Sequence, residues 1–253
     1  MTAEPGRRGP SGRTGPPSPD GHGTPVDRPV VVFDLDGVVV WTEHLWEESW
    51  EVYCRRHGAP WSREDTLRVQ GMSSPEWSRD VAGRIHGRTG ARVDPEHVYE
   101  SCVAHMRDAL LAGRGPLLPG ARDLLTDTAA ATVIGLASSA ARPVIDTVLE
   151  REGLADLFAA TVSSEEVARG KPSPDVYTEA LRRLGVPPST AVPLAVEDSA
   201  NGIRAAGAAH MRVVALPNRD YPPGEDALAL AEHVAADHDD ARAYLRSALG
   251  AAP

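Results

Sequence analysis

Short apolar runs alternate with longer segments of helical periodicity over most of the chain. The first run, residues 30–33, consists of three valines and a phenylalanine, which is typical of a strand buried on both faces of a parallel sheet. Similar runs predict further strands at 132–137, 159–162, 191–196 and 212–216, with one more short strand at 233–236. The intervening segments predict helices at 119–130, 142–152, 174–184, 200–208 and 239–249. This alternation predicts an α/β fold built on a parallel sheet.

A different pattern occupies the chain between the first strand and residue 117. Apolar and aromatic residues recur there at helical spacing, which predicts helices at 42–57, 62–70, 74–86 and 95–112. Gly71 and turns at 87–90 and 113–116 separate or end these helices. No strand pattern interrupts them, so we expect an all-helical cap domain at 43–115, inserted into a discontinuous Rossmann-like core formed by 29–42 and 116–250. Hinges between the two are expected at 40–42 and 113–116.

The first 28 residues differ in composition from the rest of the chain. They contain six glycines and six prolines and no apolar run. Such a segment cannot bury enough surface to offset the entropy lost on ordering, so a disordered tail is expected at 1–28. It has no hydrophobic stretch of the kind that a secretory signal requires.

Charge and cysteine content limit the classes of partner. The formal net charge of −10 argues against nucleic acid, because a protein that binds a phosphate backbone needs a basic face. No apolar run is long enough to cross a bilayer, so no membrane partner is expected. The two cysteines, Cys54 and Cys102, are far apart and lack metal-ligand spacing, which favours a reducing, cytoplasmic location. We expect a monomer or homodimer whose partner is a small phosphorylated metabolite.

The first strand ends in two acidic residues, Asp34 and Asp36, followed by Gly37. Alternation along extended backbone lets both carboxylates project from the same side, at the edge of the sheet where ligands bind in open α/β folds. Two crowded acids repel each other unless a cation neutralises them or one of them stays protonated. The first solution predicts a hard divalent ion such as Mg²⁺, and the second predicts a general acid. A plain turn that ends the strand is the alternative.

Other polar residues follow later strands. Glu197 and Asp198 form a second acidic pair after 191–196, and four carboxylates at neighbouring strand ends would call for a metal. Ser138 and Ser139 follow 132–137 and begin a helix, where anions are favoured, although either serine can also serve as a helix N-cap. Lys171 stands between a glycine and a proline, as a fixed cation for phosphate or as an ordinary surface lysine.

Taken together, these residues resemble the four signature motifs of the haloacid dehalogenase superfamily of phosphatases and phosphomutases. The motifs occur in order as Asp34-Leu-Asp36-Gly37, as Ser138 after an apolar strand, as Lys171 in Gly-Lys-Pro-Ser-Pro-Asp, and as Glu197-Asp198-Ser-Ala-Asn-Gly. The likeness covers about residues 30–216 and is greatest to the subgroup of β-phosphoglucomutase and small sugar-phosphate phosphatases. The predicted helical insertion lies where that family's first type of cap domain belongs.

The resemblance implies a role for each motif residue. Asp34 would be the nucleophile that forms an aspartyl-phosphate, and Asp36 the general acid and base. It implies a Mg²⁺ cofactor, and the residues that would hold it are Asp34, the backbone carbonyl of Asp36, Asp198 and, directly or through water, Glu197. Ser138 and Lys171 would bind the phosphoryl oxygens, with the adjacent Ser139 as a further candidate. The dehalogenase branch lacks an acid two positions after its nucleophile, so Asp36 excludes carbon–halogen cleavage.

Substrate choice is expected to depend on the cap. Candidate substrate-binding residues are Thr42, Trp46, Gly71, Met72, Ser73 and Trp77, although the 71–74 segment can equally be an ordinary turn between helices. Ser74 stands where a β-phosphoglucomutase has an arginine, and Trp46 stands where it has a histidine. These differences favour hydrolysis of a small phosphate monoester over phosphoryl transfer to sugar, although Arg79 or Arg84 could replace the missing arginine. A sugar or cyclitol phosphate fits the cap size, as would phosphoglycolate or a nucleotide monophosphate. A β-phosphoglucomutase-type phosphomutase is the alternative.

Overall fold

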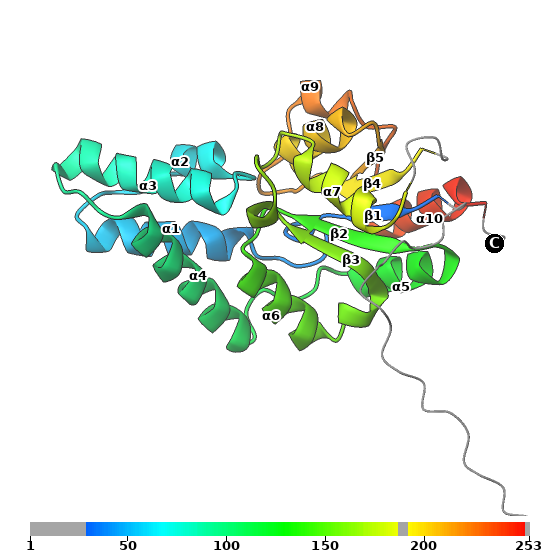
Figure 1. Ribbon diagram of the computed structural model, residues 1–253, viewed down its shortest axis with the longest axis horizontal. Helices are drawn as coiled ribbons and strands as arrows, with labels where there is room; N and C mark the ends of the chain where they lie inside the picture. Colours follow the sequence, from blue (N-terminus) through cyan, green and yellow to red (C-terminus); the bar gives the residue numbers. More distant parts are fainter. Residues whose placement is uncertain (1–28, 187–191, 251–253) are drawn as a thin grey trace, which may run out of the picture.

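The computed structural model describes residues 29–186 and 192–250, and the predicted tail at 1–28 lies outside this part of the chain. Six parallel strands form one sheet in the order β3-β2-β1-β4-β5-β6 (Figure 1). Their bounds are β1 Val31–Phe33, β2 Ile134–Ser138, β3 Phe158–Ser163, β4 Leu194–Glu197, β5 Arg212–Ala215 and β6 His233–Val234. The predicted α/β fold with a parallel sheet is confirmed.

Helices cover both faces of the sheet. Helices α5 (Ala121–Ala131), α6 (Arg142–Glu152) and α10 (His238–Ala248) share a hydrophobic cluster with Val31 and Phe33 of β1. Helices α7 (Asp175–Arg183) and α8 (Ala200–Ala208) share a second cluster with Val32. Successive side chains of β1 therefore enter opposite layers, as expected of a strand buried on both faces. Three shorter elements complete this part: η1 Ala155–Leu157, η2 Ser164–Glu166 and α9 Glu225–Leu228.

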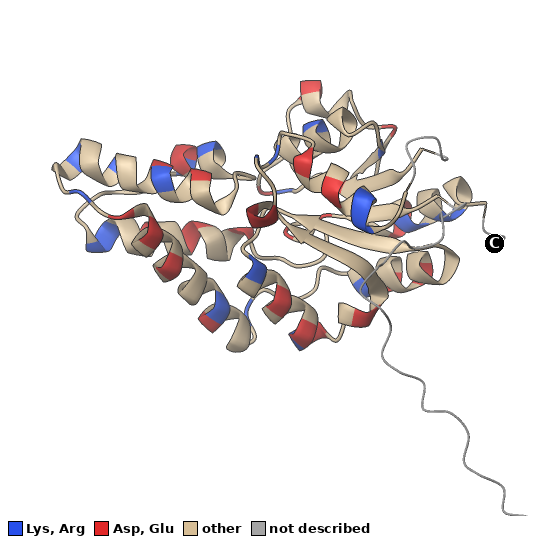
Figure 2. Cartoon of the chain, in the orientation of Figure 1, with Lys and Arg blue, Asp and Glu red and all other residues tan. Residues whose placement is uncertain are grey.

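Residues 43–115, here called the helical insertion, form four helices between β1 and β2. They are α1 Glu43–Arg56, α2 Arg63–Val69, α3 Ser74–Thr89 and α4 Pro95–Leu111. They lie together at one end of the molecule (Figure 1, left). Figure 2 shows Lys, Arg, Asp and Glu distributed along the outer helices, whereas the central strands are largely uncharged. No helix in the described part of the chain combines the length and the apolar character needed to cross a membrane.

Two predicted boundaries need correction. Helix α3 does not end at residue 86: it continues through Gly87 to Thr89 and ends where Gly90 takes a left-handed φ of 74°. A glycine inside a helix costs only about 1 kcal/mol, so Gly87 does not break it. The fourth strand begins at Leu194 rather than at 191, because Pro193 has no N–H to donate to a sheet ladder. Residue 191 itself lies outside the described residues.

The two connections of the helical insertion run side by side. The Trp41 amide donates to the Pro116 carbonyl at 3.0 Å, and the Leu118 amide donates to Val39 at 3.0 Å. Arg151 of α6 holds the second connection, because its guanidinium donates to the carbonyls of Leu110, Arg114 and Gly115. One partly buried cation therefore satisfies three carbonyl groups that follow or end helix α4.

Replacing Arg151 by Met should lower the free energy of unfolding by about 2 kcal/mol, because three carbonyls lose a charged donor. Urea unfolding followed by circular dichroism measures this change. Arg55→Met is the matched control: its ion pair with Glu51 lies on the exposed face of α1, and its loss should cost less than about 0.5 kcal/mol. Equal losses in the two variants would show that Arg151 does not hold the connection.

Candidate active site

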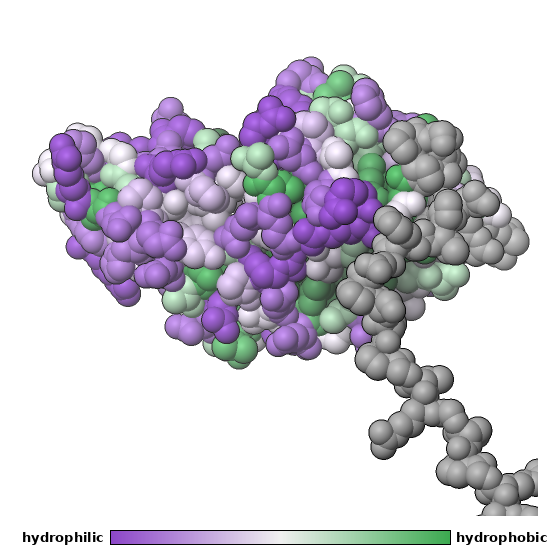
Figure 3. Space-filling view, in the orientation of Figure 1, coloured by the Kyte–Doolittle hydropathy of each residue, from purple (hydrophilic) through white to green (hydrophobic). Residues whose placement is uncertain are grey.

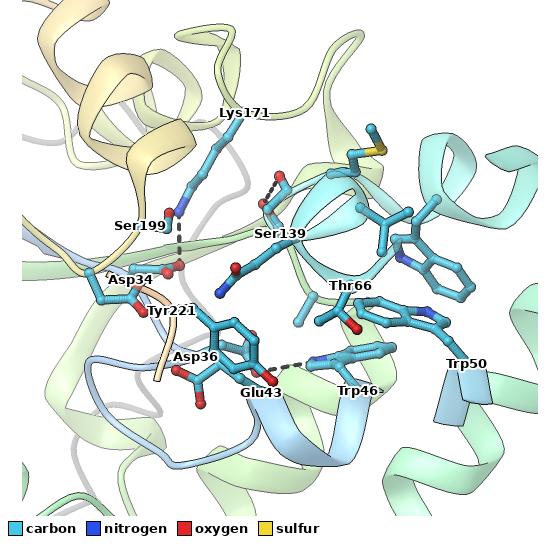
Figure 4. A pocket seen from close by; sticks show the side chains of 17 residues that line it. Asp34, Asp36, Glu43, Trp46, Trp50, Thr66, Ser139, Lys171, Ser199 and Tyr221 are labelled. Atoms are coloured by element: carbon cyan, nitrogen blue, oxygen red, sulfur yellow. Dashed lines mark hydrogen bonds and ion pairs between the residues drawn. The ribbon is translucent and has the colours of Figure 1, made fainter. Parts of the chain in front are cut away.

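A lysine and three carboxylates meet where β1 and β4 end. Parallel pairing places Phe33 of β1 beside Val196 of β4, so Asp34 and Glu197 lie at the same edge of the sheet. The Lys171 ammonium lies 2.8 Å from Asp34 Oδ1 (Figure 4). It also lies 2.5 Å from Glu197 Oε1. Lys171 is only 2% exposed. The structure thus places Lys171 in a buried ion-pair network and not on the surface.

Burial and pairing act in opposite directions on Lys171. Burial alone lowers the pKa of a lysine, but the Asp34 and Glu197 carboxylates more than offset this effect and raise the pKa of Lys171. The ammonium also lies 5.0 Å from the centroid of the Tyr177 ring, whose negative face favours a cation. Lys171 therefore carries a permanent charge in the site.

Glu197 orients Lys171. Its Oε1 accepts hydrogen bonds from Lys171 and, at 2.7 Å, from the Tyr177 hydroxyl. Its Oε2 accepts from the Asp198 amide at 3.1 Å and from the Ser199 hydroxyl at 3.2 Å. The carboxylate lies directly over Gly202 of α8, where a Cβ atom would come within 1.8 Å of Oε1. A residue without a side chain at 202 is therefore required for this arrangement.

The acidic cluster has the chemistry of a magnesium site. One carboxylate oxygen from each of Asp34, Glu197 and Asp198 lies within 4.8 Å of the others, and all three residues are buried. Burial raises the pKa of Asp34 to about 8, an effect that Lys171 offsets only in part and that the charge of Glu197 reinforces. Burial also raises the pKa of Asp198 well above its ordinary value, with Glu43 and Glu197 adding to it. One lysine does not neutralise three carboxylates, and hard oxygen donors suit Mg²⁺.

Asp36 makes different contacts. Its carboxylate is not part of that cluster: Oδ1 accepts hydrogen bonds from the Thr42 hydroxyl and, at 3.1 Å, from Trp46 Nε1. Burial raises the pKa of Asp36, and these two hydrogen bonds offset part of the rise. Both donors reach the same oxygen, which leaves Oδ2 without a recorded donor among the described residues. A carboxyl group held by one oxygen can present the other to a ligand.

The two serines after β2 occupy different positions. Ser138 is fully buried, accepts a hydrogen bond from the Ala140 amide at 3.0 Å, and does not line the pocket. Ser139 lines the pocket, and its hydroxyl donates to the Gly71 carbonyl at 3.0 Å. The Ser139 hydroxyl thus joins the end of β2 to the helical insertion.

A pocket lies between the strand ends and the helical insertion. Of the residues expected there from the sequence, the structure brings together Asp34, Asp36, Trp46, Gly71, Met72, Trp77, Ser139, Lys171 and Asp198 along its wall. Thr42 and Ser73 are not in the wall: Thr42 supports Asp36, and the Ser73 side chain caps α3. Trp41 is 44% exposed, packs against His44 and does not line this pocket.

Several wall residues were not predicted from the sequence. They are Glu43, Trp50, Thr66, Val69, Gln70, Ala140, Ser199 and Tyr221. Trp50 follows Trp46 by four positions, so the helical period carried a signal for it. Tyr221 lies in a loop with no distinctive pattern, and its hydroxyl donates to Glu47 of α1. Asn201, in the fourth motif, donates to the Gln70 carbonyl at 3.1 Å. The helical insertion is thus held over the strand ends by contacts from the loops at Ser139 and Tyr221 and from the first turn of α8 at Asn201.

The comparisons with known proteins agree with this geometry. A sequence profile of the haloacid dehalogenase-like hydrolases matches residues 29–210. Hexitol phosphatase B of Escherichia coli is 32% identical over 77% of this chain and 86% of its own length. Validoxylamine A 7'-phosphate phosphatase of Streptomyces hygroscopicus is 30% identical over 80% of this chain and 90% of its own. A crystal structure of a CbbY variant from Rhodobacter sphaeroides with xylulose 1,5-bisphosphate has a TM-score of 0.70 and 25% identity, covering 84% of this chain and 95% of that one.

Fold, site and relatives together define a hydrolase of phosphoric monoesters that is built on a parallel sheet. The chain belongs to the haloacid dehalogenase-like hydrolase family. The family resemblance drawn from the four motifs is therefore confirmed.

Placing a methyl group at residue 202 tests the support of Lys171. Gly202→Ala should displace the Glu197 carboxylate and lower kcat/KM for phosphate ester hydrolysis about 100-fold, because the lysine loses its orientation. Gly207→Ala, in the same helix but with no atom within 4 Å of its Cβ, is the control and should keep full activity. Phosphate release measures both. Unchanged activity in Gly202→Ala would mean that Glu197 does not position Lys171.

Proposed function

We propose that this protein is a Mg²⁺-dependent phosphatase that hydrolyses a small sugar or cyclitol monophosphate through an aspartyl-phosphate on Asp34. One observation carries the proposal: Asp34, paired with Lys171, lines the same pocket as Asp36, whose Oδ2 accepts no hydrogen bond from the described residues. A nucleophile and a proton donor are thus available to one phosphate ester. Relatives named for a hexitol phosphate and for validoxylamine A 7'-phosphate support the substrate class.

In the first step the Asp34 carboxylate attacks phosphorus, and the bond between phosphorus and the ester oxygen breaks. Asp36 gives its proton to that oxygen, so the sugar leaves as a neutral alcohol. Lys171 stabilises the negative charge that the phosphoryl oxygens carry in the transition state. Glu197 and Tyr177 keep the ammonium in position during this step.

In the second step Asp36, now a carboxylate, takes a proton from water as the water attacks phosphorus. The bond between phosphorus and the Asp34 oxygen breaks, which releases inorganic phosphate and restores both carboxyl groups. Thr42 and Trp46 keep Asp36 facing the pocket in both protonation states, because both donate to the same oxygen. Ser139, which lines the pocket just after β2, the strand paired with β1, would contact the phosphate together with Lys171, whereas Ser138 does not line the pocket.

Asp34, Asp198 and the Asp36 backbone carbonyl would hold the metal ion, with Glu197 next to them. When bound, Mg²⁺ supplies charge that shields the Asp34 carboxylate from the phosphate and stabilises the transferring group. The buried acidic cluster supports this assignment because its excess negative charge requires a cation.

We propose the same division into domains as the sequence predicts: residues 29–42 and 116–250 form the α/β core, and 43–115 form the cap. The paired connections at Trp41 and Pro116 support this boundary. Closure of the cap over the strand ends would exclude bulk water from the phosphoenzyme.

A phosphomutase is the weaker candidate. It must grip a second phosphate on the substrate or intermediate, which requires a cation from the cap. Ser74, which stands where a mutase has an arginine, is 1% exposed and does not line the pocket. The hydrolytic assignment therefore has the better support.

The decisive experiment measures phosphate release from a panel of sugar and cyclitol monophosphates with Mg²⁺ and with a chelator. Phosphate release should require Mg²⁺ and should be absent from the Asp34→Asn variant. Wild-type protein quenched with acid during turnover should be heavier by the mass of one phosphoryl group. Mg²⁺ should also raise the Tm of the wild type but not of Asp198→Asn. Conversion of β-glucose 1-phosphate to glucose 6-phosphate with a bisphosphate primer, without phosphate release, would establish the mutase instead.

Leaving-group dependence tests the role of Asp36. In Asp36→Asn, kcat/KM for a sugar phosphate should fall about 1,000-fold, because an alkoxide leaves poorly without a proton. The fall for p-nitrophenyl phosphate should be at least about ten times smaller, since p-nitrophenolate leaves unprotonated. Asp34→Asn serves as the control and should abolish turnover of both esters. If Asp36→Asn lowers kcat/KM equally for the sugar phosphate and for p-nitrophenyl phosphate, Asp36 is not the general acid.

A further inference from the structure

The wall of the pocket opposite Asp34 and Lys171 is aromatic. Trp46, Trp50 and Trp77 pack against one another with ring centroids 5.8 to 5.9 Å apart, and Val69 and Met72 extend the same surface. In Figure 4, Asp34 and Lys171 lie on one side of the pocket, and Trp46 and Trp50 lie on the other. The exterior face seen in Figure 3 is mainly hydrophilic, with hydrophobic residues in small separate spots. A phosphate bound beside Lys171 would therefore direct the rest of its ester toward indole rings.

This pocket carries very little positive charge. Among the described residues that line it, Lys171 is the single lysine or arginine, and it is already paired with Asp34 and Glu197. Four wall residues are acidic: Asp34, Asp36, Glu43 and Asp198.

Two arginines that lie over aromatic rings beside this region, Arg63 and Arg84, do not line the pocket. Arg63 lies 4.8 Å from the Tyr221 ring and donates to the Asp220 carbonyl, and Arg84 lies 5.5 Å from the Trp61 ring and pairs with Asp65. Away from the proposed metal site, a second negative group on the substrate would therefore meet Asp36, Glu43 and the indoles, with no lysine or arginine among the described wall residues to pair with it. Like charges brought together in such a site are strongly disfavoured.

One buried donor in the wall has no partner. Trp50 is 5% exposed and lines the pocket, yet its Nε1 makes no hydrogen bond to any described residue. By contrast, Trp46 Nε1 donates a hydrogen bond to Asp36, and the Thr66 hydroxyl donates one to Glu47. An indole N–H is a donor only, so the group that would satisfy it is an oxygen acceptor such as a hydroxyl or ring ether.

We infer that the substrate carries a single phosphate and an uncharged polyhydroxy body, whose C–H face packs on Trp46, Trp50 and Trp77 and whose oxygen accepts from Trp50 Nε1. This inference rests on the proposed function and narrows it. It excludes bisphosphates and phosphorylated acids such as phosphoglycolate, and it retains hexitol, pyranose and cyclitol monophosphates.

Binding, rather than turnover, separates this inference from the proposed function. The Asp34→Asn protein is titrated with two pairs of ligands, sorbitol 6-phosphate against 6-phosphogluconate and fructose 6-phosphate against fructose 1,6-bisphosphate, and tryptophan fluorescence is followed. In each pair, the ligand that carries no charge besides its one phosphate should bind at least about 10-fold more tightly. Equal or tighter binding of the charged members overturns the inference, as does failure of any polyol phosphate to bind more tightly than inorganic phosphate. If the ligand affinities follow the expected order but the wild-type protein releases no phosphate, only the proposed phosphatase activity would be refuted.

Two substitutions test the residues named. Gln70→Arg adds a cation to the wall and should raise the relative affinity for fructose 1,6-bisphosphate about 10-fold, whereas Leu67→Arg, on the exposed side of the same helix, should not. Trp50→Phe keeps an aromatic ring but removes the N–H. It should therefore lower the affinity for sorbitol 6-phosphate about 5-fold and leave the affinity for inorganic phosphate unchanged. Trp41→Phe, outside the pocket, is its control. Equal weakening of both ligands by Trp50→Phe would show that its N–H does not contact the body.

Discussion

The pairing of Lys171 with Asp34 and Glu197 is the interaction on which the site depends. Two adjacent parallel strands, β1 and β4, both end in acids, and their buried carboxylates would repel each other without a cation between them. Lys171 lies between them and bonds to both. Tyr177 and the start of α8 donate further hydrogen bonds to Glu197, so both of its buried carboxylate oxygens have partners within the fold.

The pocket joins two surfaces of opposite chemistry. The strand ends contribute charged and hydrogen-bonded groups that are fixed by the sheet register, whereas the helical insertion contributes indoles and aliphatic side chains. The link between them is Asp36, which belongs to the strand-end loop but is held by Thr42 and Trp46 at the start of the insertion. Trp46 therefore belongs to both surfaces, with its ring in the aromatic wall and its N–H on Asp36.

Local patterns in the sequence were sufficient to predict the sheet, most helices and the charged half of the site. Apolar runs that end in acidic, serine or glycine residues signal buried strands with functional ends, because both features lie within a few residues. The helical period places Trp50 on the same face of α1 as Trp46, but how much of that face lines the pocket depends on packing between helices, so Trp50 was missed. Tyr221 was missed because its position depends on Glu47, 174 residues away. The predicted end of α3 was wrong because Gly87 and Gly90 stand close together and only Gly90 adopts the left-handed conformation that ends the helix.

The neighbouring connections at Trp41 and Pro116 have a consequence for how such an enzyme can change over time. Because the insertion leaves and rejoins the α/β part at adjacent points, its helices do not set the pairing of any strand. Substitutions in its aromatic wall can accumulate while the arrangement of Lys171 and its carboxylates is inherited intact. Under the proposed function, the substrate range can thus change through substitutions in one segment while the strand order of the other is kept.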